Sequence, residues 1–135
     1  PVYYPSVTID GRRFADGGLR GPLPLAPAAR SGAAVVVAVD TGPGFDASAP
    51  DARLPAPPLL RAHDDATGIL MAAVTAAELA LWRALPARPH LVYVRPRCER
   101  GVTFRTDLAE AYLEEGYRAT RAALDREPGL AKLRR

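Results

Sequence analysis

The sequence contains few of the residues that would reveal a function by themselves. Its single cysteine, Cys98, excludes an intrachain disulfide framework. Its two histidines have no cysteine or carboxylate pattern around them that indicates a metal site. No run approaches the roughly 18 apolar residues typical of a membrane span. The whole sequence, 48% hydrophobic and 24% charged, is typical of a globular domain, and we expect neither a cofactor nor a metal.

The chain also lacks a large excess of positive over negative charge. The 18 basic and 15 acidic residues give a net charge of +3, too small to indicate a nucleic-acid partner. Only Lys132 is a lysine. The one local excess of positive charge lies between Arg83 and Arg105, a stretch that holds six arginines and a single acidic residue, Glu99. This stretch is either a solvated edge or a patch that favours peripheral contact with an anionic membrane surface.

The order of the expected elements indicates the α/β fold class. Residues 7–14 predict a hairpin, because Asp10-Gly11 tolerates the positive φ angles of a tight turn. Residues 25–31 predict a short helix that Gly32 stops. Residues 33–39 are a valine-rich run that predicts a strand buried on both faces, as in a parallel sheet covered by helices.

The second half continues the alternation. Residues 41–58 are rich in proline and glycine and predict a long loop, with a hypothetical role as a lid. Residues 59–85 predict a long helix interrupted near Gly68, and residues 91–94 a second strand. A final helix follows Asp107, which with Glu110 matches a capping box.

Asp16-Gly17-Gly18 is the candidate catalytic motif. It follows the hairpin and precedes a helix that begins among prolines. Two glycines permit a tight turn and leave the aspartate carboxylate uncrowded. Taken alone, such a motif is more often a structural turn than a catalytic site.

The wider pattern resembles the acid segment of patatin-like phospholipases, in which a proline and a short glycine-turn hairpin precede Asp-Gly-Gly. The likeness covers residues 5–40 well and residues 90–125 fairly, whereas residues 43–85 match only loosely. It implies part of a three-layer α/β/α fold with a mostly parallel central sheet. It also implies a Ser-Asp dyad that hydrolyses lipid acyl esters, with Asp16 as general base.

The serine of that dyad is not evident. The three serines are Ser6, Ser31 and Ser48, and none lies in a Gly-x-Ser-x-Gly elbow. Residues 1–135 are therefore expected to be the C-terminal portion of a single patatin-like domain, inactive alone, with the elbow upstream. The compartment stays open, with a cytoplasmic location as the default expectation, because any targeting signal would also lie upstream. The oligomeric state is not predicted.

Three alternatives stay open. Residues 17–21 also resemble the family's oxyanion loop, although no elbow follows them as that assignment would require. The chain could instead be a non-catalytic patatin-like module that binds lipid or a partner. It could also be an unrelated α/β module in which Asp16 only shapes a turn.

Overall fold

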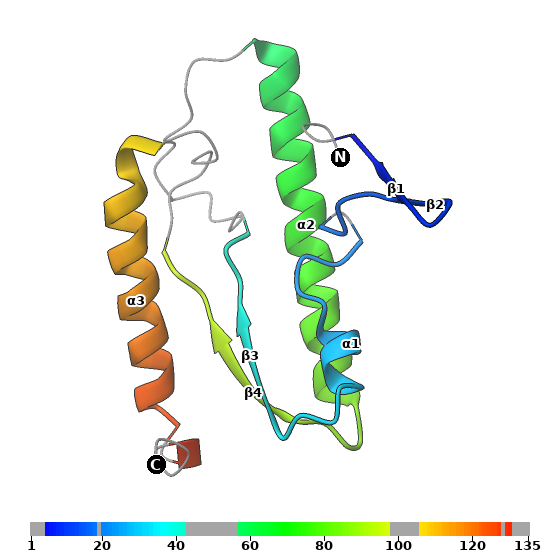
Figure 1. The fold of residues 1–135 in the computed structure, drawn as a ribbon. Helices are drawn as coiled ribbons and strands as arrows, with labels where there is room; N and C mark the ends of the chain where they lie inside the picture. Colours follow the sequence, from blue (N-terminus) through cyan, green and yellow to red (C-terminus); the bar gives the residue numbers. More distant parts are fainter. Residues whose placement is uncertain (1–4, 19, 43–56, 98–105, 128, 131–135) are drawn as a thin grey trace.

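The computed structural model describes residues 5–18, 20–42, 57–97, 106–127 and 129–130. Two small sheets and three α-helices make up this part of the chain (Figure 1). In chain order the elements are β1 (Val7–Ile9), β2 (Arg12–Phe14), α1 (Leu25–Ala29), β3 (Val35–Val39), α2 (Pro58–Ala84), β4 (His90–Val94), the 3-10 turn η2 (Thr106–Leu108) and α3 (Ala109–Asp125).

Strands β3 and β4 form a parallel pair, with Val35 opposite His90 and Val39 opposite Val94. Parallel neighbours require a crossover connection, and the chain between them includes the long helix α2. The predicted α/β class is thus confirmed at this level: a mixed helix and strand structure with a small parallel sheet.

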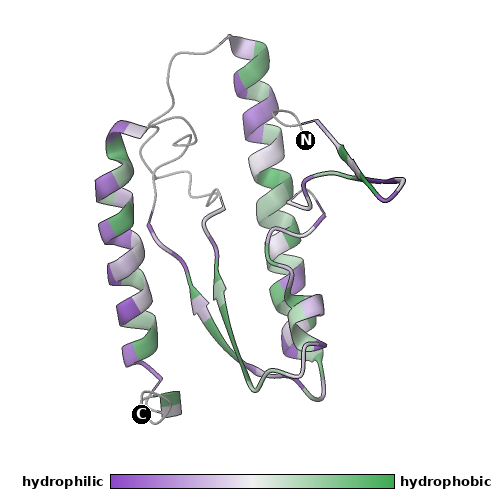
Figure 2. Ribbon diagram, viewed as in Figure 1, coloured by the Kyte–Doolittle hydropathy of each residue, from purple (hydrophilic) through white to green (hydrophobic). Residues whose placement is uncertain are grey.

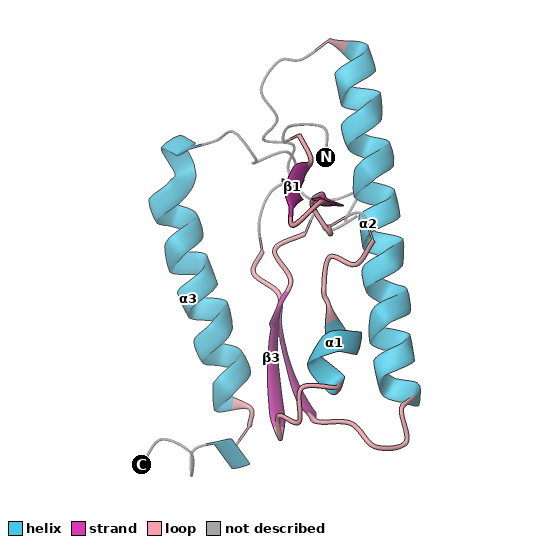
Figure 3. Cartoon of the chain, turned by 45° about the vertical axis from the view of Figure 1, so that its right-hand side comes forward, coloured by secondary structure: helices cyan, strands magenta, loops and turns pink. Residues whose placement is uncertain are grey.

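Both faces of this sheet carry packed helical residues, because successive strand residues point to opposite faces. On one face, Ala38 packs with Leu23, Leu25 and Trp82, which come from α1, α2 and the segment before α1. On the other face, Val92 and Val94 pack with Ala123 of α3 and its neighbours. Figures 1 and 3 show the sheet between α3 on one side and α1 with α2 on the other.

Burial of β3 on both faces was predicted, and this prediction is wrong. Val37 and Val39 are 51% and 47% exposed, whereas their register partners Val92 and Val94 are 2% and 1% exposed. The reason is that α3 packs over β4 and does not extend across β3. Half of one sheet face is therefore left open to solvent.

Helix α2 runs without a break, so the predicted interruption near Gly68 is also wrong. Glycine costs only about 1 kcal/mol in a helix interior, and strong helix formers surround this one. Pro58 lies in the first turn, where its missing N–H is tolerated. By length and composition α2 could also cross a membrane, which the search for apolar runs did not indicate.

The start of α3 differs from the predicted capping box. The helix begins at Ala109, and its N-cap residue, Leu108, makes no side-chain cap hydrogen bond. Asp107 instead lies within the preceding 3-10 turn. That turn displaces the start of the helix, so Asp107 does not occupy the N-cap position that the pattern assigned to it.

The hairpin prediction is confirmed. Strands β1 and β2 pair antiparallel, and Asp10 and Gly11 both have positive φ angles, 49° and 73°. The hairpin projects beside α2 (Figure 1), and Val7 and Ile9 are more than half exposed. The predicted stop of α1 is confirmed as well, since the helix ends at Ala29 and Gly32 has a φ of 77°.

Candidate functional site

Asp16 lies on an exposed turn between the hairpin and α1. Its Oδ1 accepts a hydrogen bond from the Gly18 backbone N–H at 2.8 Å. Within the described parts of the chain, Oδ2 has no hydrogen-bond partner. The carboxylate is thus oriented through one oxygen while the other is available to an incoming group.

The turn is closed by backbone hydrogen bonds and held against α2. The N–H groups of Arg20 and Gly21 both donate to the Gly17 carbonyl, at 2.9 and 3.0 Å. The Leu23 N–H donates to Glu78 Oε2 at 3.2 Å. A Cβ at Gly21 would lie 2.6 Å from Glu78 Oε1, so only glycine allows this approach unless the Glu78 side chain shifts.

Glu78 is a residue that sequence reasoning missed. It is an isolated carboxylate in an alanine-rich helix, 62 positions after Asp16, and no motif links the two. Its spacing alone places it on the packed face of α2, four residues before buried Trp82. Its hydrogen-bond partner, the Leu23 N–H, follows only from the tertiary structure, which brings α2 and the turn together.

The glycines of the motif act differently from the prediction. Neither Gly17 nor Gly18 has a positive φ, so the turn does not need them for an unusual backbone angle. A Cβ at Gly18 would lie 3.2 Å from Asp16 Oδ1, whereas one at Gly17 would meet nothing within 4 Å. Gly18 therefore leaves room for the carboxylate, as expected, and Gly17 is not sterically required.

A second polar cluster lies at the carboxyl end of the parallel sheet. Asp40 follows β3 directly and is only 4% exposed. Its Oδ2 accepts a 2.6 Å hydrogen bond from the Tyr93 hydroxyl, and its Oδ1 accepts one from the Gly42 N–H at 3.0 Å. Arg95 Nε lies 3.9 Å from Oδ2. The carboxyl ends of strands are where open α/β sheets bind ligands.

The surroundings of the Tyr93 hydroxyl shift its pKa. Burial raises the pKa of Tyr93 to about 12, and the hydrogen bond to Asp40 and the negative charge of that carboxylate act in the same direction, while Arg95 opposes them. The phenol therefore stays protonated and keeps donating to Asp40 across the ordinary pH range. Sequence reasoning missed Asp40 and Tyr93; an aspartate directly after a valine-rich strand was the available signal.

The arginines of the predicted basic stretch have divided roles. Arg88 donates to the carbonyl oxygens of Arg83 and Leu85, which closes the end of α2. The Arg97 backbone N–H donates to Glu115 of α3 at 2.7 Å. This bond, together with Arg118, lowers the pKa of Glu115. Residues 98–105 of the stretch lie outside the described residues, as does most of the 41–58 loop.

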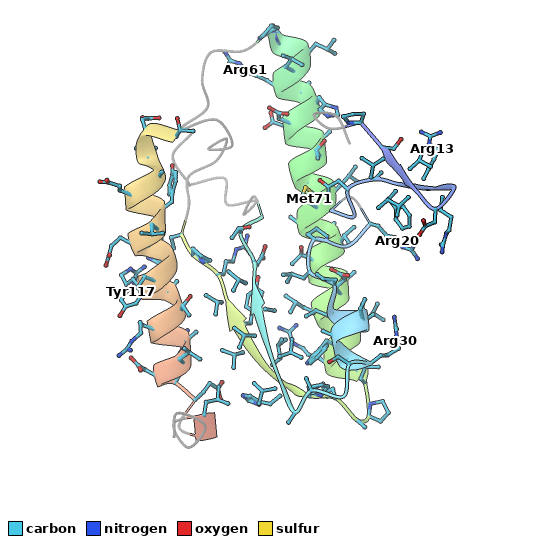
Figure 4. All side chains as sticks on the ribbon, viewed as in Figure 1. Arg13, Arg20, Arg30, Arg61, Met71 and Tyr117 are labelled. Carbon is cyan, nitrogen blue, oxygen red and sulfur yellow. The ribbon has the colours of Figure 1, made fainter. Side chains whose placement is uncertain are left out.

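Three other arginines lie on the side of the molecule where the hairpin is. Arg13, Arg20 and Arg30 point outward on the side of the molecule where the hairpin projects (Figure 4). Arg13 donates to the Ser6 hydroxyl, and all three side chains are exposed. Arg13 and Arg20, three and four positions from Asp16, therefore give the turn a basic flank that the sequence pattern did not indicate.

In the described part of the chain, no three His, Cys, Asp or Glu side chains gather as metal ligands would. Comparison with known proteins adds no assignment: no protein-family model, no curated protein and no solved structure matches this chain. The patatin-like resemblance therefore stays a prediction. The chemistry of the two sites must be argued from their own geometry.

Proposed function

We propose that this protein contributes the aspartate of a Ser-Asp lipid acyl hydrolase, within a patatin-like three-layer α/β/α domain. The observation that carries the proposal is the Asp16 carboxylate, exposed and oriented through one oxygen by Gly18, with the other oxygen available. A general base needs such an oxygen within hydrogen-bond reach of the proton that it removes.

In the proposed reaction a serine hydroxyl from polypeptide upstream of residue 1 donates to Asp16. The carboxylate takes the serine proton as the serine oxygen attacks the ester carbonyl, and an acyl-enzyme forms with loss of the alcohol. Water then attacks the acyl group, and the fatty acid leaves. The exposed arginines flanking the turn favour approach of an anionic lipid surface.

The open surface of the molecule supports the same proposal. Val37 and Val39 are exposed on β3, whereas their register partners Val92 and Val94 on β4 are buried. Further strands and helices of one larger domain would cover this face.

The test compares the 135-residue chain with the gene product expressed from its native start codon, which the proposal requires to carry the serine elbow upstream of residue 1. We expect ester hydrolysis only from the latter protein. There, Asp16→Asn should lower kcat at least about a hundredfold, because acid–base catalysis contributes roughly 10²–10⁴-fold. Asp10→Asn, the same change on the hairpin turn, is the matched control and should leave kcat unchanged. Equal kcat in the Asp16→Asn protein would exclude the dyad.

A second candidate function is a non-catalytic module that binds lipid, and α2 is the observation that favours it. In the most apolar 18-residue window of this helix only 11% of the residues are buried. The outer face of α2 carries small and apolar side chains (Figure 2). The exposed ones are Ile69, Leu70, Ala73, Ala76, Ala77, Ala80 and Leu81. An exposed apolar stripe of this length commonly marks an interaction surface.

Vesicle co-sedimentation separates this candidate from the first. If α2 binds lipid, Leu70→Gln should weaken binding to phosphatidylcholine vesicles, whereas Leu113→Gln should not. Leu113 is the matched control because it is a 78% exposed leucine on a different helix. Binding that both substitutions reduce equally would argue against a role for α2.

A further inference from the structure

We infer that Arg95, held beside buried Asp40, forms a phosphate-binding site at the carboxyl end of the β3–β4 sheet. This site is separate in its residues from the Asp16 turn, and the inference goes beyond the proposed hydrolase function. The ligand class is a phosphate group, either of a lipid head group or of a soluble phosphate ester.

The first step of the argument concerns Asp40. A buried carboxylate is costly unless it has donors and a neighbouring positive charge. Gly42 and Tyr93 supply one hydrogen bond to each oxygen, and Arg95 supplies the charge. The carboxylate is thus satisfied without a direct hydrogen bond from the guanidinium.

The second step concerns Arg95. Its 3.9 Å separation from Asp40 is that of an ion pair and is too long for a hydrogen bond. Arg95 also donates a side-chain hydrogen bond to the Tyr93 hydroxyl oxygen. The ion pair and this bond hold the arginine in place, and the rest of its five-donor guanidinium is left for another acceptor. The Arg95 side chain is 45% exposed, whereas that of Asp40 is 5% exposed, so the guanidinium faces the solvent side of the pair.

The third step concerns the type of ligand. Arginine presents its donors in a planar fork that matches two oxygens of a phosphate. The site lies where the carboxyl ends of two parallel strands meet, which is the ligand-binding edge of open α/β sheets. Because Asp40 is saturated and set behind Arg95, an anion would meet the guanidinium before the carboxylate.

The test measures inorganic phosphate binding to the full chain by calorimetry. Wild-type protein should bind phosphate, and Arg95→Gln should weaken the affinity by about tenfold or more, since hydrogen bonds to charged groups contribute that much. Arg95→Lys should recover only part of the affinity, because lysine keeps the charge and loses the fork. Arg83→Gln, at an exposed arginine on α2, is the matched control and should bind like wild type.

Vesicles distinguish the two sources of the ligand. Arg95-dependent binding to phosphatidylglycerol vesicles, in competition with free phosphate, would assign the site to a lipid head group. Binding of free phosphate alone would assign it to a soluble ester. No phosphate binding, or an equal loss in Arg83→Gln and Arg95→Gln, would overturn the inference. Either result leaves the Asp16→Asn test of the hydrolase untouched.

Discussion

Asp16 and Asp40 show how environment separates two aspartates in one chain. Asp16 is exposed, and its only hydrogen-bond partner among the described residues is the Gly18 N–H two positions away. Asp40 is 4% exposed and bonded to Tyr93, 53 positions away. The first carboxylate is available for chemistry, whereas the second is committed to holding neighbouring groups in place.

The substitution Tyr93→Phe tests how much the hydrogen bond from Tyr93 to Asp40 contributes to stability. It should lower the free energy of unfolding at neutral pH by roughly 1.5–3 kcal/mol, because a buried carboxylate loses a donor. Since the pKa of Tyr93 is raised to about 12, its linked contribution to stability is complete below about pH 10, the pKa of an unfolded tyrosine. This contribution is lost as the pH rises toward 12, because the unfolded state releases the proton first.

Urea unfolding measured between neutral pH and pH 12 would check both effects. The wild-type protein should lose this part of its stability across the alkaline window, and the Phe variant should lack that part of the slope. A tyrosinate absorbance titration adds a direct readout: Tyr93 should ionise late in the wild type, and this late step should be absent from the variant. An unchanged late titration would assign the effect to another tyrosine.

At the scale of elements, glycines illustrate how the same residue acts in opposite ways. Gly11 has a φ of 73° in the hairpin turn, a conformation that a side chain resists. Gly116 lies inside α3, where a Cβ would meet nothing within 4 Å. The hairpin uses glycine for its backbone, whereas the helix only loses stability through it.

Substitution by alanine should therefore have opposite signs at these two positions. Gly11→Ala should weaken the hairpin by about 1–2 kcal/mol, seen as faster amide exchange across β1 and β2. Gly116→Ala should raise the free energy of unfolding by about 0.5–1 kcal/mol in a denaturant titration. A loss of stability in Gly116→Ala would mean that α3 packs more tightly than its contacts indicate.

At the scale of the whole molecule, stability depends on two small clusters on opposite faces of one sheet. Trp82, 3% exposed, is the largest side chain of the cluster that joins α1, α2 and β3. The other cluster joins β4 to α3 through Val92, Val94 and Ala123. Since no other described hydrophobic residue is buried, each cluster accounts for a large share of the stability.

Trp82→Ala should cost about 3–5 kcal/mol, a large part of the 5–15 kcal/mol typical of a domain. Far-ultraviolet circular dichroism during urea unfolding would measure it without needing the lost indole. Leu81→Ala is the adjacent control: that side chain is 68% exposed, so the change should stay within about 0.5 kcal/mol. Similar losses in both variants would contradict the assignment of this core.

Local patterns predicted what local chemistry controls. The Asp10-Gly11 turn, the stop of α1 before Gly32 and the strand predicted at residues 91–94 follow from backbone preferences and short apolar runs. The alternation of helices and strands predicted a parallel sheet, and β3 and β4 do pair in parallel. The capping box at Asp107 and the break at Gly68 were wrong, because a preceding 3-10 turn and strong helix-forming neighbours outweighed single residues.

The sequence by itself determined the elements, their order and the exposed Asp16 turn, because these depend on residues within a few positions of one another. Only the tertiary structure decided which distant groups meet. Glu78 reaches the turn across 55 positions to Leu23, and Asp40 meets Tyr93 and Arg95 across more than 50. It also decided that Val37 and Val39 stay exposed, because the burial of a strand depends on what packs over it.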